Sequence, residues 1–397
     1  MNYKLDQRSK FLFISNFFKD VFYFVYFIML FVSCTEEKKI NSNVVEEKIL
    51  FPVRIGNNWG ICDTSGNFIL QPEYEYIGEF VEDLAIIVKN KKYAYVKSNG
   101  KIVCPFNYNA ATDFKESKAI VLGSDNKIMC IDTAFRVLFT LPDSISETSV
   151  FSQGLLAAKC NEKYGYFNEH GKLVIPFSYC IAGDFREGMA PVAVKNLSDK
   201  KDSIYYEHFY INTKGDKVFQ SNFKDSYSFS EGIAAVQFEN GKWGWIDKKG
   251  KTMFQAYFDE CKSFSEGFAS FKLDRKWGLI NSKGKIILKP SYDYIGDMRL
   301  GMASVMLGPQ TYGYIDTTGK ITLNPLYKIA SSFYGNYAFV VLNEKISVIS
   351  KNGKIFCKEN FDGVPNFLGV DMGFVEPSMN LHLYANSAAT DSISMIP

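Results

Sequence analysis

One stretch of the chain returns about nine times, and it constrains the fold more than any other feature. Residues 238–254 read FENGKWGWIDKKGKTMF, and counterparts recur at steps of 34–36 residues, with a single step of 44. The position of Trp243 is filled in turn by Trp59, Tyr93, Ile128, Tyr164, His208, Trp243, Trp277, Tyr312 and Ile346. A fixed period of this length indicates a repeat architecture, in which each unit packs mainly on its neighbours.

The repeated unit reads as three short strands joined by tight turns. Apolar residues at 233–238 precede Asn240-Gly241, and Asn-Gly is the strongest short signal for a hairpin. The second strand, residues 243–247, has alternate side chains on opposite faces. A turn at residues 247–250 combines an aspartate with a glycine, and a third strand begins at Lys251. The unit is therefore predicted to be a three-stranded antiparallel meander.

These units predict an all-β fold of tandem three-stranded antiparallel repeats, each of about 35 residues. Two arrangements of the repeats are open. An open β-solenoid or superhelix is favoured, because propeller blades usually need four strands in about 40 residues and rings rarely exceed about eight blades. A closed β-propeller-like ring is the alternative if the connector, for example residues 292–295, supplies a fourth strand.

The motif resembles that of the bacterial WG-repeat (KWG-repeat) proteins. Lys-Trp-Gly stands at residues 242–244 and 276–278, and Phe-Ser-Glu-Gly stands at residues 229–232 and 264–267. The resemblance runs from about Phe51 to Lys358 and implies a β-repeat fold, without pointing to one activity. We interpret the recurring aromatic position as part of the structural core of the repeats, with these members: Trp59, Tyr164, Trp243, Trp277 and Tyr312.

The first 33 residues read as a signal peptide. Basic residues precede an uncharged run at residues 21–33, which is too short to span a bilayer, where about 20 residues are needed. The run ends in Phe31-Val32-Ser33-Cys34, which resembles the lipobox of bacterial lipoproteins with Phe31 in place of the usual leucine. The resemblance implies lipidation of Cys34 and attachment to a membrane. The alternative is a buried apolar helix followed by an ordinary cysteine.

Three further segments complete the expected organisation of the chain. Residues 34–48 are polar and charged, so we expect a flexible linker between the lipid anchor and the repeats. The repeats are expected to span residues 49–358, and residues 359–397 to form a C-terminal cap with a frayed end. The lipoprotein resemblance implies an exported protein of the outer membrane, and the acidic pair Glu36-Glu37 resembles a surface-export signal.

Composition and motifs argue against several classes of function. Lys plus Arg number 45 and Asp plus Glu number 43, so the chain lacks the basic excess of nucleic-acid-binding proteins. The cysteines and three histidines have no metal-ligand spacing, and we expect neither metal nor cofactor. No common catalytic motif occurs. The periodic carboxylates Glu187, Glu231 and Glu266 stand one repeat apart beside turn glycines, which indicates turn chemistry rather than a catalytic pair.

Three residues are candidate binding residues because they depart from the repeat. Tyr205 and Tyr206 belong to an insertion at residues 196–207, for which a solvated extension is the alternative. Trp245 stands where other units have Tyr or Ile, and its indole offers a flat face to a sugar or a protein.

The sequence favours a non-enzymatic binding or scaffold lipoprotein of the cell envelope that engages protein or glycan partners through its repeats. One alternative is an enzyme, or an accessory subunit of one, with a site in residues 196–207 or in the C-terminal tail. The other is a purely structural envelope component.

Overall fold

The computed structural model describes residues 50–197, 204–254, 257–343, 345–356, 361–362, 364 and 381–382. The chain divides into two compact units, Met1–Lys48 and Ile49–Pro397, and all described residues belong to the second. The expected signal peptide, Cys34, the linker and most of the tail lie outside the described residues. Within the described residues, no helix is long and apolar enough to cross a bilayer.

The described strands form nine antiparallel sheets, which we number in chain order. The first five sheets contain the following strands: sheet 1, β1 (Leu50–Ile55), β2 (Asn58–Asp63) and β3 (Phe68–Tyr74); sheet 2, β4 (Tyr76–Ile77), β5 (Leu84–Lys89) and β6 (Lys92–Lys97); sheet 3, β7 (Ala110–Ala111), β8 (Lys118–Leu122), β9 (Ile128–Asp132) and β10 (Val137–Thr140); sheet 4, β11 (Ile145–Thr148), β12 (Leu155–Cys160), β13 (Lys163–Asn168), β14 (Leu173–Tyr179) and β32 (Leu381–His382); sheet 5, β15 (Ile181–Ala182), β16 (Met189–Leu197) and β17 (Ile204–Asn212).

The last four sheets repeat the same pattern. They contain the following strands: sheet 6, β18 (Asp225–Ser226), β19 (Ile233–Gln237) and β20 (Trp243–Asp247); sheet 7, β21 (Glu260–Cys261), β22 (Phe268–Leu273), β23 (Lys276–Asn281) and β24 (Ile286–Tyr292); sheet 8, β25 (Tyr294–Ile295), β26 (Met302–Met306), β27 (Tyr312–Asp316) and β28 (Ile321–Tyr327); sheet 9, β29 (Ile329–Ala330), β30 (Tyr337–Leu342) and β31 (Lys345–Ser350).

Each sheet contains the hairpin of the predicted meander, and its third strand is regular in sheets 1, 3, 4, 7 and 8. In sheets 2, 5, 6 and 9 the third strand is reduced to isolated bridges, such as Ile246 with Thr252. Most sheets also gain a short strand from the connector. In sheet 8, β26 and β27 form the hairpin and β28 is the third strand. The connector before them contributes β25, in which Tyr294 pairs with Met306 and Ile295 pairs with Val305. Strands β4, β7, β15, β18, β21 and β29 take the same place in their sheets. The all-β class and the tandem antiparallel repeats are therefore confirmed, and in sheets 3, 4, 7 and 8 the connector supplies a fourth strand.

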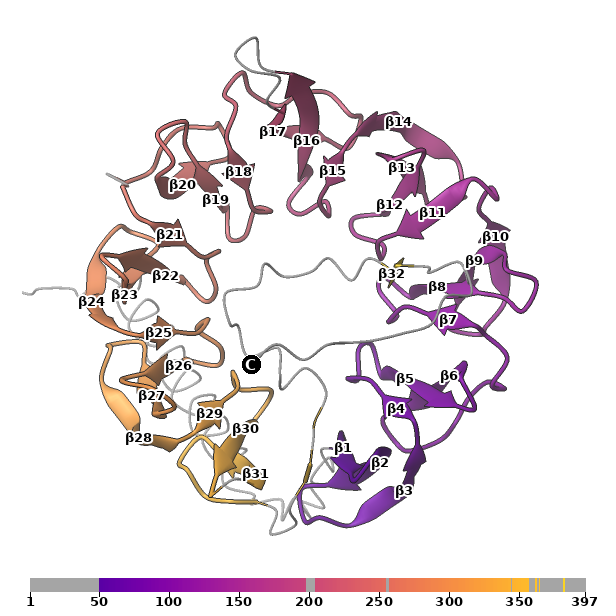
Figure 1. The fold of residues 1–397 in the computed structure, drawn as a ribbon, viewed down its shortest axis with the longest axis horizontal. Coiled ribbons are helices and arrows are strands. Elements are labelled where there is room, and N and C mark those ends of the chain that lie inside the picture. The colour runs from indigo at the N-terminus through magenta and orange to yellow at the C-terminus, as the bar shows by residue number, and fades with distance from the viewer. Residues whose placement is uncertain are drawn as a thin grey trace, which may run out of the picture. The chain divides into compact units, whose positions relative to one another are not determined.

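The core consists of nine clusters, each of which lies between two successive sheets. Trp245 of sheet 6, for example, shares a cluster with Phe264 and Phe271 of sheet 7 and its connector. The ninth cluster joins sheet 9 to sheet 1, because it contains Phe339 together with Phe51. The sheets therefore follow one another around a closed circle, with the third strands such as β24 and β28 on the outside (Figure 1).

The two ends of the repeat region meet in sheet 1. Asp362 N–H donates to the carbonyl of Arg54 over 2.9 Å, as Lys328 N–H donates to Val341 in sheet 9. The carboxylate of Asp362 accepts a hydrogen bond of 2.7 Å from Gly56 N–H at the tip of the first hairpin. Asp362 thus takes the place in sheet 1 that connector residues take elsewhere, and C-terminal residues complete the N-terminal sheet.

These contacts correspond to the closed ring, the second of the two expected arrangements, rather than to the open solenoid that the repeat length favoured. The junction of sheets 1 and 9, which we call the seam, has its own packing. Phe51 stands where most other units have alanine, and its ring lies 5.7 Å from that of Phe339 and 6.2 Å from that of Phe361. Val348 stands where sheet 8 has Tyr314, which leaves room for these rings. The larger side chain on β1 and the smaller side chain on β31 compensate each other in volume, so sheets 1 and 9 can pack closely.

Candidate functional site

The recurring aromatic position lies in the core of the ring. Trp243, Trp277 and Tyr312 are buried, and Trp59 and Tyr164 are half-buried. Each pairs with an aromatic residue 15 positions further along the chain, as Trp277 does with Tyr292 and Trp243 with Phe258. These side chains pack against neighbouring sheets, so they contribute stability rather than an open face.

Trp245 is fully buried, which corrects its assignment as a candidate binding residue. Its indole N–H donates to the carbonyl of Lys262 over 2.9 Å, and its ring packs against Phe264 at 5.5 Å. Four tyrosine hydroxyls make the equivalent bond to a carbonyl 17 residues further on: Tyr95, Tyr166, Tyr210 and Tyr314. In these five units the side chain ties its sheet to the following connector, and Trp245 makes the bond with an indole N–H instead of a phenol hydroxyl.

The periodic carboxylates form a second set of contacts between sheets, which we call the glutamate ladder. Glu82 accepts hydrogen bonds of 2.8 Å from the backbone N–H groups of Glu116 and Ser117, one sheet further on. The same step is repeated by these pairs: Glu116 to Gln153 and Gly154, Gln153 to Gly188, Glu187 to Gly232, Glu231 to Gly267, and Glu266 to Leu300 and Gly301. Glu187, Glu231 and Glu266 were predicted to be turn residues, and their place in turns does not by itself reveal that each carboxylate binds the turn of the next sheet.

Glu187 shows the electrostatics of the ladder. Partial burial works against its charge, but the Lys248 ammonium at 2.9 Å and the N–H of Gly232 together hold its pKa below the usual value. An ionised carboxylate that is bound by backbone N–H groups is stabilising but is poorly suited to transfer protons. The carboxylate of Glu187 therefore serves to bind the turn of the next sheet.

The hairpin of β16 and β17 departs most from the repeat. Its two strands pair over nine residues each, from Met189 opposite Asn212 to Leu197 opposite Ile204. Tyr205 and Tyr206 are 49% and 47% exposed, in consecutive positions on β17. The insertion predicted from the sequence is thus an extension of a regular hairpin, and residues 198–203 at its tip lie outside the described residues.

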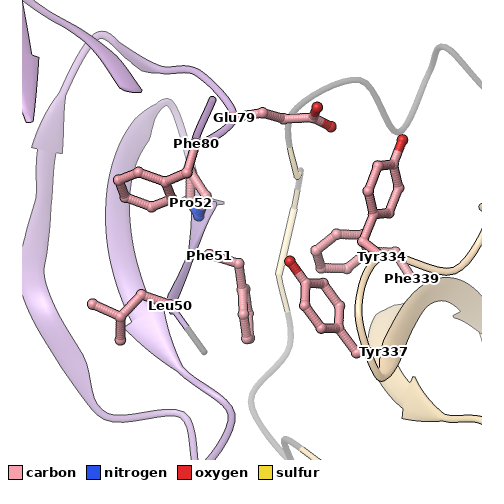
Figure 2. Close-up of a pocket in the computed structure, with 8 residues that line it drawn as sticks. All are labelled: Leu50, Phe51, Pro52, Glu79, Phe80, Tyr334, Tyr337 and Phe339. Atoms are coloured by element: carbon pink, nitrogen blue, oxygen red, sulfur yellow. The ribbon is translucent and has the colours of Figure 1, made fainter. Parts of the chain in front are cut away.

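A small pocket lies at the seam, where sheet 1, sheet 9 and the connector of sheet 2 meet (Figure 2). Its cavity volume is about 90 Å³. Strand β1 supplies Leu50, Phe51 and Pro52, and β30 supplies Tyr337 and Phe339. The connectors supply Glu79, Phe80 and Tyr334. Sequence reasoning did not find this pocket, because its walls come from opposite ends of the repeat region.

The chemistry of the pocket is dominated by aromatic rings and one carboxylate. Figure 2 shows the ring of Phe51 facing Tyr337, with the Glu79 carboxylate on the side of Tyr334. Burial, together with the charges of Glu79 and Tyr334, raises the pKa of Tyr337 to about 12.

The thiol and imidazole groups of the described residues are dispersed. No cluster of three or more potential metal ligands occurs among them. Burial raises the pKa of the Cys130 thiol to about 12, so this cysteine is not a nucleophile at neutral pH. His208 is buried at the recurring aromatic position, and its Nδ1 lies 3.4 Å from the Ser226 hydroxyl and 3.8 Å from the Asp225 carboxylate.

The model of the WG containing repeat matches the chain in seven segments. They are residues 59–93, 94–127, 164–197, 209–243, 243–277, 277–308 and 312–345. The two longer gaps between these segments are residues 128–163, around Ile128, where the motif is degenerate, and residues 198–208, in the extended hairpin. Among curated proteins, none matches this chain in sequence.

Several solved structures are similar in fold. BamB from Moraxella catarrhalis is 11% identical with a TM-score of 0.41, and the alignment covers 70% of this chain and 94% of BamB. PorZ, a surface component of the type-IX secretion system of Porphyromonas gingivalis, is 10% identical with a TM-score of 0.31, over 74% of this chain and 42% of PorZ. The WD40 β-propeller domain of Doa1 is 12% identical with a TM-score of 0.29, over 61% of this chain and 91% of that domain.

Proposed function

The chain belongs to the WG containing repeat family, and on that premise we propose that it is a non-enzymatic binding scaffold of the cell envelope, anchored through a lipidated Cys34. The ring provides a rigid frame, because three sets of contacts join its sheets: the core clusters, the bonds of Trp245 and its tyrosine counterparts, and the glutamate ladder. Side chains at the recurring positions make these contacts between sheets, so they are not available to a ligand. We therefore expect a ligand to bind where the sequence departs from the repeat.

The exposure of Tyr205 and Tyr206 carries this proposal. Adjacent residues of a strand point to opposite faces, so the two rings give the hairpin an aromatic residue on each side. Tyrosine is enriched at protein interfaces, because its ring buries apolar area and its hydroxyl keeps a hydrogen bond. We propose a protein partner that contacts both faces of the hairpin, and a glycan is the alternative ligand.

A binding experiment tests this function. The chain with Tyr205→Ala and Tyr206→Ala is compared with the Tyr257→Ala variant, which removes a tyrosine that is 65% exposed elsewhere on the ring. Capture from envelope extracts and binding to a glycan array are measured for both. Loss of one defined protein partner in the double variant alone supports the proposal. Unchanged capture, or hydrolysis of a glycan or peptide by the pure protein, would overturn it.

The anchor is tested separately, at the sequence position that carries it. One acyl chain holds a protein at a membrane only marginally, whereas two or more anchor it stably, so retention requires a multiply acylated cysteine. Incorporation of labelled palmitate and a mature N-terminus at Cys34 are expected for the natural chain, and both should be lost in Cys34→Ala. A natural chain without label, cut away from Cys34, would exclude the lipoprotein.

A further inference from the structure

The glutamate ladder is incomplete between sheets 8 and 9. Glu266 of sheet 7 accepts hydrogen bonds of 2.6 and 2.8 Å from the N–H groups of Leu300 and Gly301 in the turn of sheet 8. Leu300 holds the same position in sheet 8 as Glu266 holds in sheet 7, but its side chain has no hydrogen-bond acceptor. Its side chain is 43% exposed, so the fold does not enclose it. The turn of sheet 9 therefore receives no carboxylate from sheet 8.

The turn of sheet 9 nevertheless keeps the form of a turn that binds a carboxylate. Tyr334 and Tyr337 exchange backbone hydrogen bonds of 2.8 and 3.1 Å, as the corresponding residues of sheet 8 do over 2.9 and 3.1 Å. The φ angle of Gly335 is +54°, almost the same as the +53° of its counterpart in sheet 8. Within the described part of the chain, no group accepts a hydrogen bond from the N–H of Gly335 or Asn336. Both residues are exposed, and successive N–H groups of a turn can bind an anion.

A lysine occupies the same place beside this turn as the lysine that pairs with the ladder. In sheet 6, Lys248 contacts the carboxylate of Glu187 at 2.9 Å and donates to the backbone carbonyl of the same residue over 3.4 Å. In sheet 9, Lys351 stands at the position of Lys248 and donates to the backbone carbonyl of Leu300 over 2.9 Å. The guanidinium of Arg299 lies 5.8 Å from the centre of the tyrosine ring next to the turn. The positive charge of a ladder step is therefore retained where its carboxylate is replaced.

The complete steps indicate which anion fits. In the step from Glu82, one carboxylate oxygen accepts from each of two successive N–H groups, both at 2.8 Å, and Glu266 binds its turn in the same way. The spacing of the two N–H groups thus matches the two oxygens of a carboxylate. Bonds of this kind are charge-assisted and stronger than those between neutral groups.

We propose that the turn of Gly335 and Asn336, together with Lys351, binds a carboxylate of a partner protein, supplied by a glutamate side chain or by the end of the chain. The bound carboxylate takes the place that glutamates of this chain take at the other steps. The site lies in sheet 9 and not in the β16–β17 hairpin, so it does not depend on the function proposed above.

Three glycine-serine heptapeptides test the site on the full chain. The first is capped at both ends and has a central glutamate, the second has glutamine instead, and the third has no acidic side chain but a free C-terminal carboxylate. Titrations are followed by the NMR resonances of the Gly335 and Asn336 amides. We expect the glutamate peptide to bind roughly tenfold more tightly than the glutamine peptide and to weaken as salt is added. Comparison of the first and third peptides shows which source of the carboxylate is preferred.

Variants of the chain identify the site. Leu300→Glu supplies the missing carboxylate from sheet 8, so it should slow hydrogen exchange at Gly335 and Asn336 and abolish peptide binding. Leu326→Glu adds the same charge at a leucine that is 71% exposed elsewhere, and it should leave binding unchanged. Lys351→Gln should reduce the preference for glutamate over glutamine.

Three results would overturn the proposal. They are equal binding of the glutamate and glutamine peptides, peptide binding that leaves the Gly335 and Asn336 resonances in place, and binding that persists in Leu300→Glu. The failure of this site would leave the result of the Tyr205 and Tyr206 experiment unaffected.

Discussion

Replacement of Trp245 measures how strongly one sheet is tied to the next. Its side chain is 0% exposed and packs against the rings of Phe254, Phe258 and Phe264, at centroid distances of 6.1, 5.5 and 5.5 Å. Removal of a buried tryptophan ring typically costs about 3–5 kcal/mol of the free energy of unfolding. Trp245→Ala also takes away the indole N–H that satisfies the carbonyl of Lys262. We therefore expect a loss near the upper end of that range.

The Trp245→Phe variant separates the two contributions. It keeps most of the apolar volume and removes the N–H donor, so the remaining loss should be about 0.5–1.5 kcal/mol, the net contribution of one hydrogen bond. Urea denaturation of both variants, followed by circular dichroism, provides the free energies, with Tyr257→Ala as the exposed control. If Trp245→Ala were no more destabilising than Tyr257→Ala, the assignment of this side chain to the core between sheets 6 and 7 would be wrong.

Three further predictions address the other contacts of the ring. Glu116→Ala should speed amide hydrogen exchange at Gln153 and Gly154, whose N–H groups it binds at 2.5 and 2.8 Å, and should leave distant turns such as that of Gly301 unchanged. Burial lowers the pKa of His208, although the Asp225 charge opposes the shift, so the unfolded chain binds a proton at this histidine more readily than the folded chain does. The free energy of unfolding should therefore be highest above the ordinary histidine pKa of about 6.5 and should fall as the pH drops below it. The His208→Phe variant should lose this dependence on pH. Asp362→Ala should destabilise the seam by about 0.5–1.5 kcal/mol, the net contribution of one hydrogen bond, because it removes the acceptor of the exposed Gly56 N–H. Hydrogen exchange should rise first at Gly56. A melting temperature and exchange pattern equal to those of the natural chain would contradict the closure.

The local structure could be predicted from the sequence because it depends on contacts within one unit. Asn240-Gly241 turns the hairpin of sheet 6, and the WGWID strand after it alternates as expected. The interpretation of Trp245 failed for a physical reason. Trp245 was predicted to bind a ligand because it differs from the residues of other units at this position. Tyrosine and tryptophan there nevertheless share one property, a polar N–H or O–H at the end of a large ring, and both use it for the same hydrogen bond.

Closure of the ring depends on contacts between residues at opposite ends of the repeat region, and periodicity carries no information about them. The signals were nevertheless present. Phe51 replaces the small residue of the other units, and Val348 replaces a large one, which are complementary changes at the two ends of the region. The two changes can be recognised as complementary only when sheets 1 and 9 are in contact. The pocket at the seam also forms only when these two sheets meet.

The completion of sheet 1 by C-terminal residues has a consequence for how the chain folds. Arg54 and Asp362 are 308 positions apart, so the contact that closes the ring is among the most non-local that this chain makes. During synthesis the N-terminal sheet remains without that edge until nearly the whole repeat region has been made. Sheets in the middle of the chain can pack on their neighbours as they appear, whereas the first sheet must wait. Folding should therefore end in a slow step, and a chain interrupted before Asp362 would present an unpaired strand edge to chaperones and proteases.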